Sequence, residues 1–141
     1  MPMNTAKVVT GGLLAGLVFN IGDFVINTFI VAEENRQLMT RLGLNPAALE
    51  SFSGVLPFIV VDFLFGILVV WTYAAIRPRF GPGVQTAVRA GLIPLIAVTL
   101  VMAAFTSVGM FPTGMFLKNT VGSIVNVLVG SIAGAWAYTE S

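Results

Sequence analysis

Four apolar stretches, each long enough to cross a lipid bilayer, make up most of this 141-residue chain. One helical crossing needs about 20 apolar residues, because the hydrocarbon core is ~30 Å thick and a helix rises ~1.5 Å per residue. Inside the hydrocarbon, every backbone polar group must also be paired, which a helix achieves within one segment. We therefore expect an all-α transmembrane bundle of four helices, with spans at about residues 8–32, 54–76, 86–108 and 117–138.

The composition supports a single integral membrane domain over residues 1–141. The chain is 57% hydrophobic and only 9% charged, whereas soluble domains carry roughly 25% charged residues. Its net charge of +1 is scattered, so no basic face marks a nucleic-acid partner. The expected surroundings are membrane lipids. Polar residues inside the first stretch favour a retained span over a cleaved signal peptide.

The chain contains no cysteine and no histidine. Thiol redox chemistry, iron–sulfur clusters and the usual zinc, copper or haem ligation need one of the two. We therefore expect no cofactor and no bound metal of these kinds, and no catalytic residue is apparent.

Residues 33–53 form the one strongly polar segment. Leucine and methionine recur at helical spacing in its first half, and Gly43 is a suitable stop. Asn45 and Pro46 fit the cap and first residue of a second short turn. We expect a short amphipathic helix here, lying at the membrane interface.

Basic residues near the span ends indicate the orientation. Four lie on the side of the chain ends and three on the other, which favours cytoplasmic termini; the two groups are Lys7, Arg77, Arg79 and Arg89, and Arg36, Arg41 and Lys118. Aromatic side chains near the same ends are predicted to act with two of these arginines as interface anchors. The predicted anchors are Trp71, Tyr73, Arg77, Arg79, Trp136 and Tyr138.

Two carboxylates, Asp23 and Asp62, lie deep within the first two apolar stretches with no basic residue beside them. Charged groups are costly in the bilayer and usually mark a function. Each lies roughly 12–14 Å below the same membrane surface if its span is helical. Antiparallel helices would therefore bring Asn20, Asp23, Asp62 and Asn126 into one polar cluster.

Small and polar residues share one face of the first and fourth spans. In the first span, Gly12, Gly16, Asn20, Asp23 and Asn27 fall within an arc of about 80°. Glycine recurs in the fourth span at Gly122, Gly130 and Gly134. Such ladders let helix backbones approach closely, and we expect them to pack helices. The last two glycines also offer a face for a homo-oligomer.

The predicted cluster has several possible roles. Two carboxylates in a low-dielectric site cannot both be charged, so at least one should keep a proton. The same oxygens, with Asn20, Asn27 and Asn126, could instead hold a cation. The asparagines could also be simple interhelical hydrogen-bond partners, and the two acids purely structural.

These alternatives lead to two functional hypotheses. The first is a non-enzymatic membrane protein whose Asp23/Asp62 cluster binds a proton or cation for transport. The second is a non-catalytic accessory subunit that packs against a larger membrane complex through its glycine faces.

The segment YAAIRPRFGPGVQTAVRAG at residues 73–91, which follows FxxGILVVW at residues 63–71, resembles a stretch of uncharacterised small four-span bacterial inner-membrane proteins. The resemblance runs from the first span to the start of the third. It implies a four-span protein of the bacterial inner membrane, and it assigns no activity and no site residue.

Overall fold

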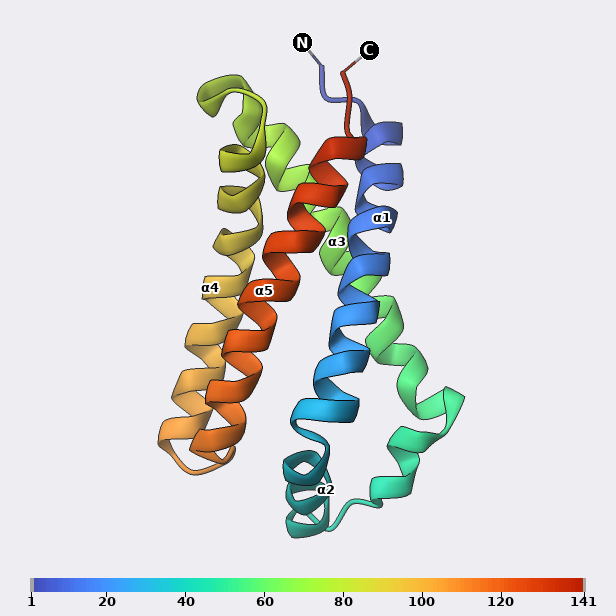
Figure 1. Cartoon of the computed structure of the whole chain (residues 1–141), viewed down its shortest axis with the longest axis vertical. Helices are drawn as coiled ribbons and strands as arrows, with labels where there is room; N and C mark the ends of the chain where they lie inside the picture. The colour runs from blue at the N-terminus through green and yellow to red at the C-terminus, as the bar shows by residue number, and fades with distance from the viewer. Residues whose placement is uncertain (1, 141) are drawn as a thin grey trace.

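The computed structural model of the chain describes residues 2–140 and is helical nearly throughout. Figure 1 shows the element order, with the two chain ends at the same end of the molecule. The helices are α1 (Thr5–Val25), α2 (Ala32–Arg41), α3 (Phe52–Phe80), α4 (Val84–Ser107) and α5 (Thr113–Ala137), together with a π-helical turn (Ile26–Ile30) and a 3₁₀ turn (Pro46–Glu50).

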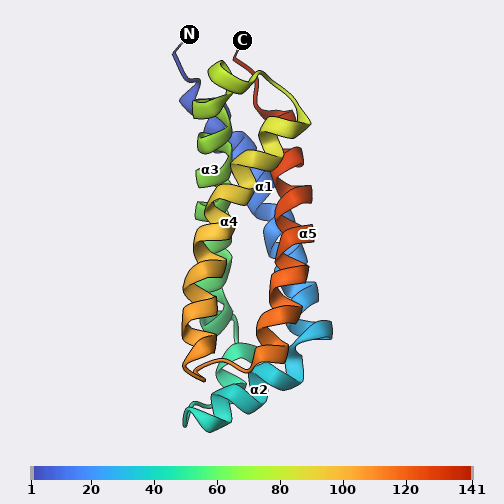
Figure 2. The ribbon, with the colours of Figure 1, turned by 90° about the vertical axis from the view of Figure 1, so that its left-hand side faces the viewer.

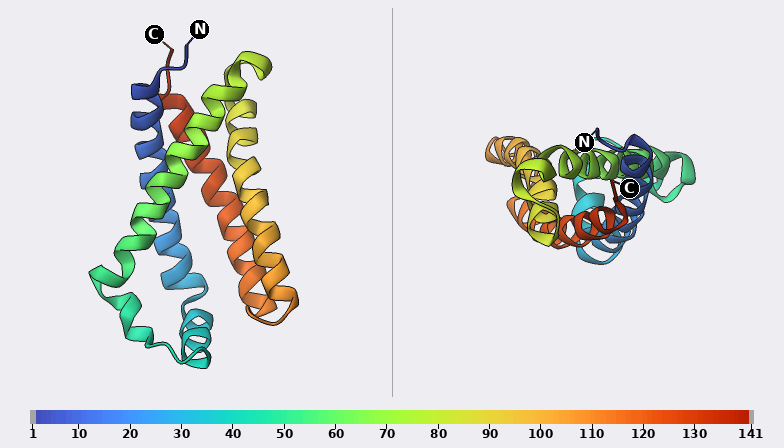
Figure 3. Two further views of the ribbon diagram at one scale, coloured as in Figure 1. Left: turned by 180° about the vertical axis from the view of Figure 1, so that it is seen from behind. Right: turned by 90° about the horizontal axis from the view of Figure 1, so that it is seen from above.

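The prediction of four membrane spans is confirmed. Thr5–Ile30, which is α1 with its π-helical turn, and helices α3, α4 and α5 are each long and apolar enough to cross a bilayer. α1 packs against α3 and α5, whereas α4 packs against α5 and α3. The view from above in Figure 3 shows this four-helix arrangement.

The main hydrophobic core lies in one half of the bundle. We call this the terminal half, because it holds both chain ends; it comprises the first halves of α1 and α4 and the second halves of α3 and α5. The opposite half, which we call the α2 half, buries only a small cluster of Ile26, Val31, Leu38 and Met115. Figures 1 and 3 show the helices spreading apart toward α2. The buried members of the main core are Val8, Ala15, Phe19, Val69, Val70, Tyr73, Ala74, Ala87, Ala90, Leu95, Val127, Ala135 and Tyr138.

Glycines let the backbones meet in the terminal half. Gly66 of α3 lies directly against the backbone of Gly12 and Gly16 of α1, so a side chain there would overlap main-chain atoms. Gly122 of α5 faces Ile26 at the other end. These contacts agree with the prediction that the glycine ladders pack helices.

The proposed oligomer face at Gly130 and Gly134 is wrong. Gly130 lies against the ring of Phe19, and Gly134 lies against Val70 and Ala15. Both glycines are buried within the chain, because α5 uses them to approach α1 and α3. They are therefore not free to pair with a second copy or a larger complex.

Two helix ends differ from the prediction. α3 continues through Pro78 to Phe80, because a proline in the last turn removes only one hydrogen bond, and the helix stops at Gly81, where φ is +80°. α5 begins at Thr113 instead of Leu117, directly after Pro112, whose missing N–H costs nothing at a helix start.

The short helix between the first two spans is present as α2, and Gly43 follows it with φ of +72°. The Asn45 side chain caps the following 3₁₀ turn by accepting from Ala47 N at 3.1 Å. Leu38 of α2 is buried against the small cluster. Figure 2 shows α2 crossing the end of the bundle opposite the chain ends.

Two polar links tie α2 to the α4–α5 hairpin. Lys118 of α5 pairs with Glu34, and this hydrogen bond holds the pKa of the Glu34 carboxyl below its ordinary value. Arg41 donates to the backbone oxygens of Met110 at 2.6 Å and Gly109 at 3.3 Å. These links hold α2 beneath the hairpin turn.

The aromatic pairs separate into exposed and buried members. Trp71 and Trp136 are exposed, as membrane anchors must be. Tyr73 and Tyr138 are buried, so their prediction as interface anchors is wrong. Their rings pack edge to face with centroids 6.0 Å apart, because the ends of α3 and α5 converge there.

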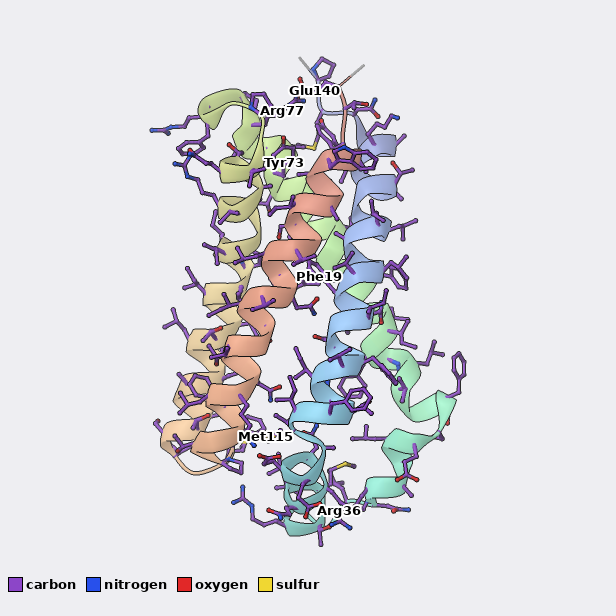
Figure 4. All side chains as sticks on the ribbon, viewed as in Figure 1. Phe19, Arg36, Tyr73, Arg77, Met115 and Glu140 are labelled. Atoms are coloured by element: carbon purple, nitrogen blue, oxygen red, sulfur yellow. The ribbon has the colours of Figure 1, made fainter. Side chains whose placement is uncertain are left out.

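The tyrosine pair belongs to a small network that joins the chain ends. The Tyr138 hydroxyl accepts from Asn4 N at 3.3 Å, and the Tyr73 hydroxyl accepts from Gly83 N at 3.1 Å. Arg77 is half-buried and pairs with Glu140 at 3.2 Å, whereas Arg79 is exposed. Figure 4 shows Tyr73, Arg77 and Glu140 together at this end.

Candidate functional site

Asp23 of α1 and Asp62 of α3 meet in the bundle. Their carboxyl groups lie side by side, within reach of a shared hydrogen bond, and both side chains are half-buried. A carboxylate is acceptor-only, so a hydrogen bond between two carboxyl groups requires a proton on one of them. Such a bond would hold one proton between the two groups.

Asn126 of α5 completes the pair from a third helix. Its amide nitrogen donates to Asp23 Oδ1 at 3.0 Å and to the backbone oxygen of Phe19 at 3.1 Å. The side chain is buried, and Gly22 makes room for it, since a side chain at Gly22 would overlap the amide. Asn126 thus fixes one Asp23 oxygen and leaves the remaining carboxyl atoms free for the proton.

The structure brings together three of the five predicted site residues. Asn20 donates to the backbone oxygens of Gly16 at 2.9 Å and Ile59 at 3.4 Å, which places it on the α1–α3 seam. Asn27 is exposed, donates to the Asp23 backbone oxygen at 2.8 Å, and accepts from Asn35. The Asn20 amide nitrogen thus bonds to backbone oxygens of this seam, and within residues 2–140 it does not donate to either carboxyl group.

The pair lies where the main core ends. Phe19, one turn before Asp23, and Val127, next to Asn126, are both members of the main core. Beyond the pair the helices spread into the α2 half, and α1 changes to a π-helical turn at Ile26–Ile30. π-helical turns are frequent at functional sites. No basic side chain among residues 2–140 forms a salt bridge with Asp23 or Asp62.

The pattern of residues did not reveal every part of this site. Gly22 lies outside the glycine ladders, and its role depends on the partner helix that faces it. The π-helical turn contains no proline or glycine that would have predicted it from the sequence. Along residues 2–140, no group of three or more acidic, histidine or cysteine side chains forms a metal site.

We expect Asn126→Ala to destabilise the protein by about 1–3 kcal/mol, because it leaves the half-buried Asp23 oxygen without its donor and removes the second hydrogen bond to the Phe19 carbonyl. The measurement is the free energy of unfolding in detergent. Asn119→Ala is the matched control, since Asn119 lies two turns away on the same helix and makes no hydrogen bond within residues 2–140. Equal losses in the two variants would contradict the assigned role of Asn126.

Comparison with known proteins returned no matching family model, no similar curated protein and no similar solved structure. The function of the chain is therefore inferred from the geometry of the site.

Proposed function

We propose that this chain is a non-enzymatic membrane protein that binds a proton at the Asp23–Asp62 pair and carries it for small-scale transport across the membrane. The observation that supports this proposal most directly is the contact between the two carboxyl groups. Acidic groups inside membrane helices recur in proton relays of pumps and transporters. A shared proton also explains how the bundle tolerates two acids without a basic partner.

The direct carboxyl–carboxyl contact favours a proton over a larger cation. A cation held between the two groups would have to replace that contact with bonds of about 2–2.6 Å to each oxygen, as Mg²⁺ and Ca²⁺ require. The remaining polar partner, Asn126, points its nitrogen toward Asp23, and a donor repels a cation. The pair as built suits a proton.

The test is a titration and a flux measurement on purified protein in liposomes that enclose a pH-sensitive dye. We expect the wild type to take up about one more proton per chain than the double variant Asp23→Asn with Asp62→Asn. We also expect the wild type to carry proton flux under an imposed potential. Glu50→Gln is the matched control, because it removes an exposed acid outside the helices that span the membrane. Equal uptake and flux in the wild type and the double variant would overturn the proposal, provided both unfold at similar temperatures.

The accessory-subunit alternative receives no support from the glycine faces. Gly12, Gly16, Gly130 and Gly134 pack within the chain. An accessory role would therefore need another surface.

A further inference from the structure

A half-open cavity of about 200 Å³, lined mostly by apolar side chains, lies between α4 and α5 in the α2 half of the bundle. Leu95, a member of the main core, lines one end. Phe111 and Met115, which belong to the small cluster beneath α2, line the other end. The cavity therefore runs from the depth at which the main core ends to the underside of α2.

Three polar side chains that line this cavity have no hydrogen-bond partner in the described part of the chain. Thr99, Asn119 and Ser123 neither donate nor accept a hydrogen bond within residues 2–140, whereas Thr106 and Thr120 bond the backbone of their own helices. Polar groups removed from bulk solvent need partners. A water takes roughly 30 Å³ in the liquid, so the cavity can hold several waters, with these three side chains as partners.

Two of the three polar side chains in this largely apolar lining lie on the helix that also carries Asn126. Ser123 lies one helical turn from Asn126 on α5, and Asn119 lies two turns away on the same face, at 3.6 residues per turn. Asn126 in turn donates to Asp23. Asn119, Ser123 and Asn126 therefore follow one another along α5 from the cavity toward the carboxyl pair.

The far end of the cavity lies under α2. Met115 packs with Leu38 and Val31 there, and Figure 4 shows Met115 at the end of α5 nearest this helix. The Lys118–Glu34 pair and the bonds from Arg41 hold α2 in place. The opposite, terminal half is closed by the main core and the backbone-to-backbone glycine contacts.

We propose that the α4–α5 cavity is an aqueous vestibule through which protons reach the Asp23–Asp62 pair from the side of the membrane where α2 lies. Waters hydrogen-bonded to Thr99, Asn119 and Ser123 carry the proton, and the core of the terminal half blocks the other side. This inference rests on the proposed function and adds to it the route and the side of entry.

The experiment uses the absence of cysteine from the chain, which makes single-cysteine variants free of background labelling. Ser123→Cys and Asn119→Cys place a thiol in the cavity, whereas Val121→Cys and Val125→Cys place it on the outer surface of α5, where the valines are 64% and 59% exposed in the bundle. The probe is a membrane-impermeant trimethylammonium methanethiosulfonate, added to one side of membrane vesicles at a time.

We expect the two cavity thiols to react at least about tenfold faster than the two lipid-facing thiols, because water in the cavity admits the reagent and lets the thiol ionise, as lipid does not. The faster reaction should occur only from the α2 side. Equal rates at all four positions, or reaction only from the side of the chain ends, would overturn the vestibule.

A second measurement tests whether protons reach the Asp23–Asp62 pair through the vestibule. Modification of Ser123→Cys should slow proton uptake by about tenfold or more, whereas the reagent should leave uptake by Val125→Cys unchanged. Modified Ser123→Cys that takes up protons at the original rate would overturn the route. Failure of the proposed function itself has a different signature: the unlabelled wild type and the Asp23→Asn, Asp62→Asn variant would then take up protons equally.

Discussion

Replacing Gly66 by alanine is expected to separate α1 from α3 and to abolish proton binding at the carboxyl pair. The added methyl group would overlap the backbone of Gly12 and Gly16. Main-chain atoms cannot rotate aside as a flexible side chain does, so the helices must move apart. We expect a loss of at least about 3 kcal/mol, at the upper end of the usual cost of overpacking.

The effect on the site follows from the position of Gly66. Asp62 lies one turn from it on α3, and Asp23 lies on the facing helix, so widening this seam pulls the two carboxyl groups apart. The free energy of unfolding in detergent and proton uptake in liposomes measure the two effects. Gly114→Ala is the matched control, because it adds the same methyl group to helix α5 where no atom lies within 4 Å. A Gly66→Ala protein as stable as that control would show that the helices are not in backbone contact.

Phe19 and Gly130 are expected to show strong coupling in a double-mutant cycle. Phe19→Ala removes a ring that is only 2% exposed and that also packs edge to face on Phe65 with centroids 5.5 Å apart. Truncation of a buried aromatic costs about 3–5 kcal/mol. Gly130→Ala should also destabilise the protein, because its methyl group would overlap the Phe19 ring.

The double variant shows whether Phe19 and Gly130 are in contact or whether each substitution lowers the free energy of unfolding independently. Without the Phe19 ring, the alanine at position 130 fills part of the space, so the double variant should be more stable than the sum of the single losses by about 1–3 kcal/mol. Phe24→Ala is the control for the ring alone, since Phe24 is 64% exposed on the same helix. Additive losses in the double variant would contradict direct contact between α1 and α5 at this level.

The spans were predictable from the sequence because apolar length is a local property. The ends of the helices were less so. The second span was predicted to end at about residue 76, but a proline in the last turn leaves the helix largely intact, and Gly81, with its positive φ, ends it. The buried positions of Tyr73 and Tyr138 depend on how α3 and α5 converge. The residue pattern of a single helix does not predict that convergence.

The carboxyl pair was predictable in part for a similar reason. Depth in the membrane follows from counting residues along a helix, so Asp23, Asp62 and Asn126 could be placed at one level. The direction in which an amide points depends on its nearest free acceptor. Asn20 therefore bonds to the α3 backbone oxygen of Ile59 instead of the acids.

The cavity was not predicted, because it depends on how α4, which carries Thr99, packs against α5, which carries Asn119 and Ser123.

The uneven distribution of the core has a consequence for motion in the bundle. Side-chain and backbone contacts concentrate in the terminal half, whereas the α2 half depends on a small apolar cluster and a few polar links. Local opening costs least where buried contacts are fewest. We therefore expect the helices to open first at their α2 ends, so that amide hydrogens near α2 exchange with solvent before those around Phe19 and Val70.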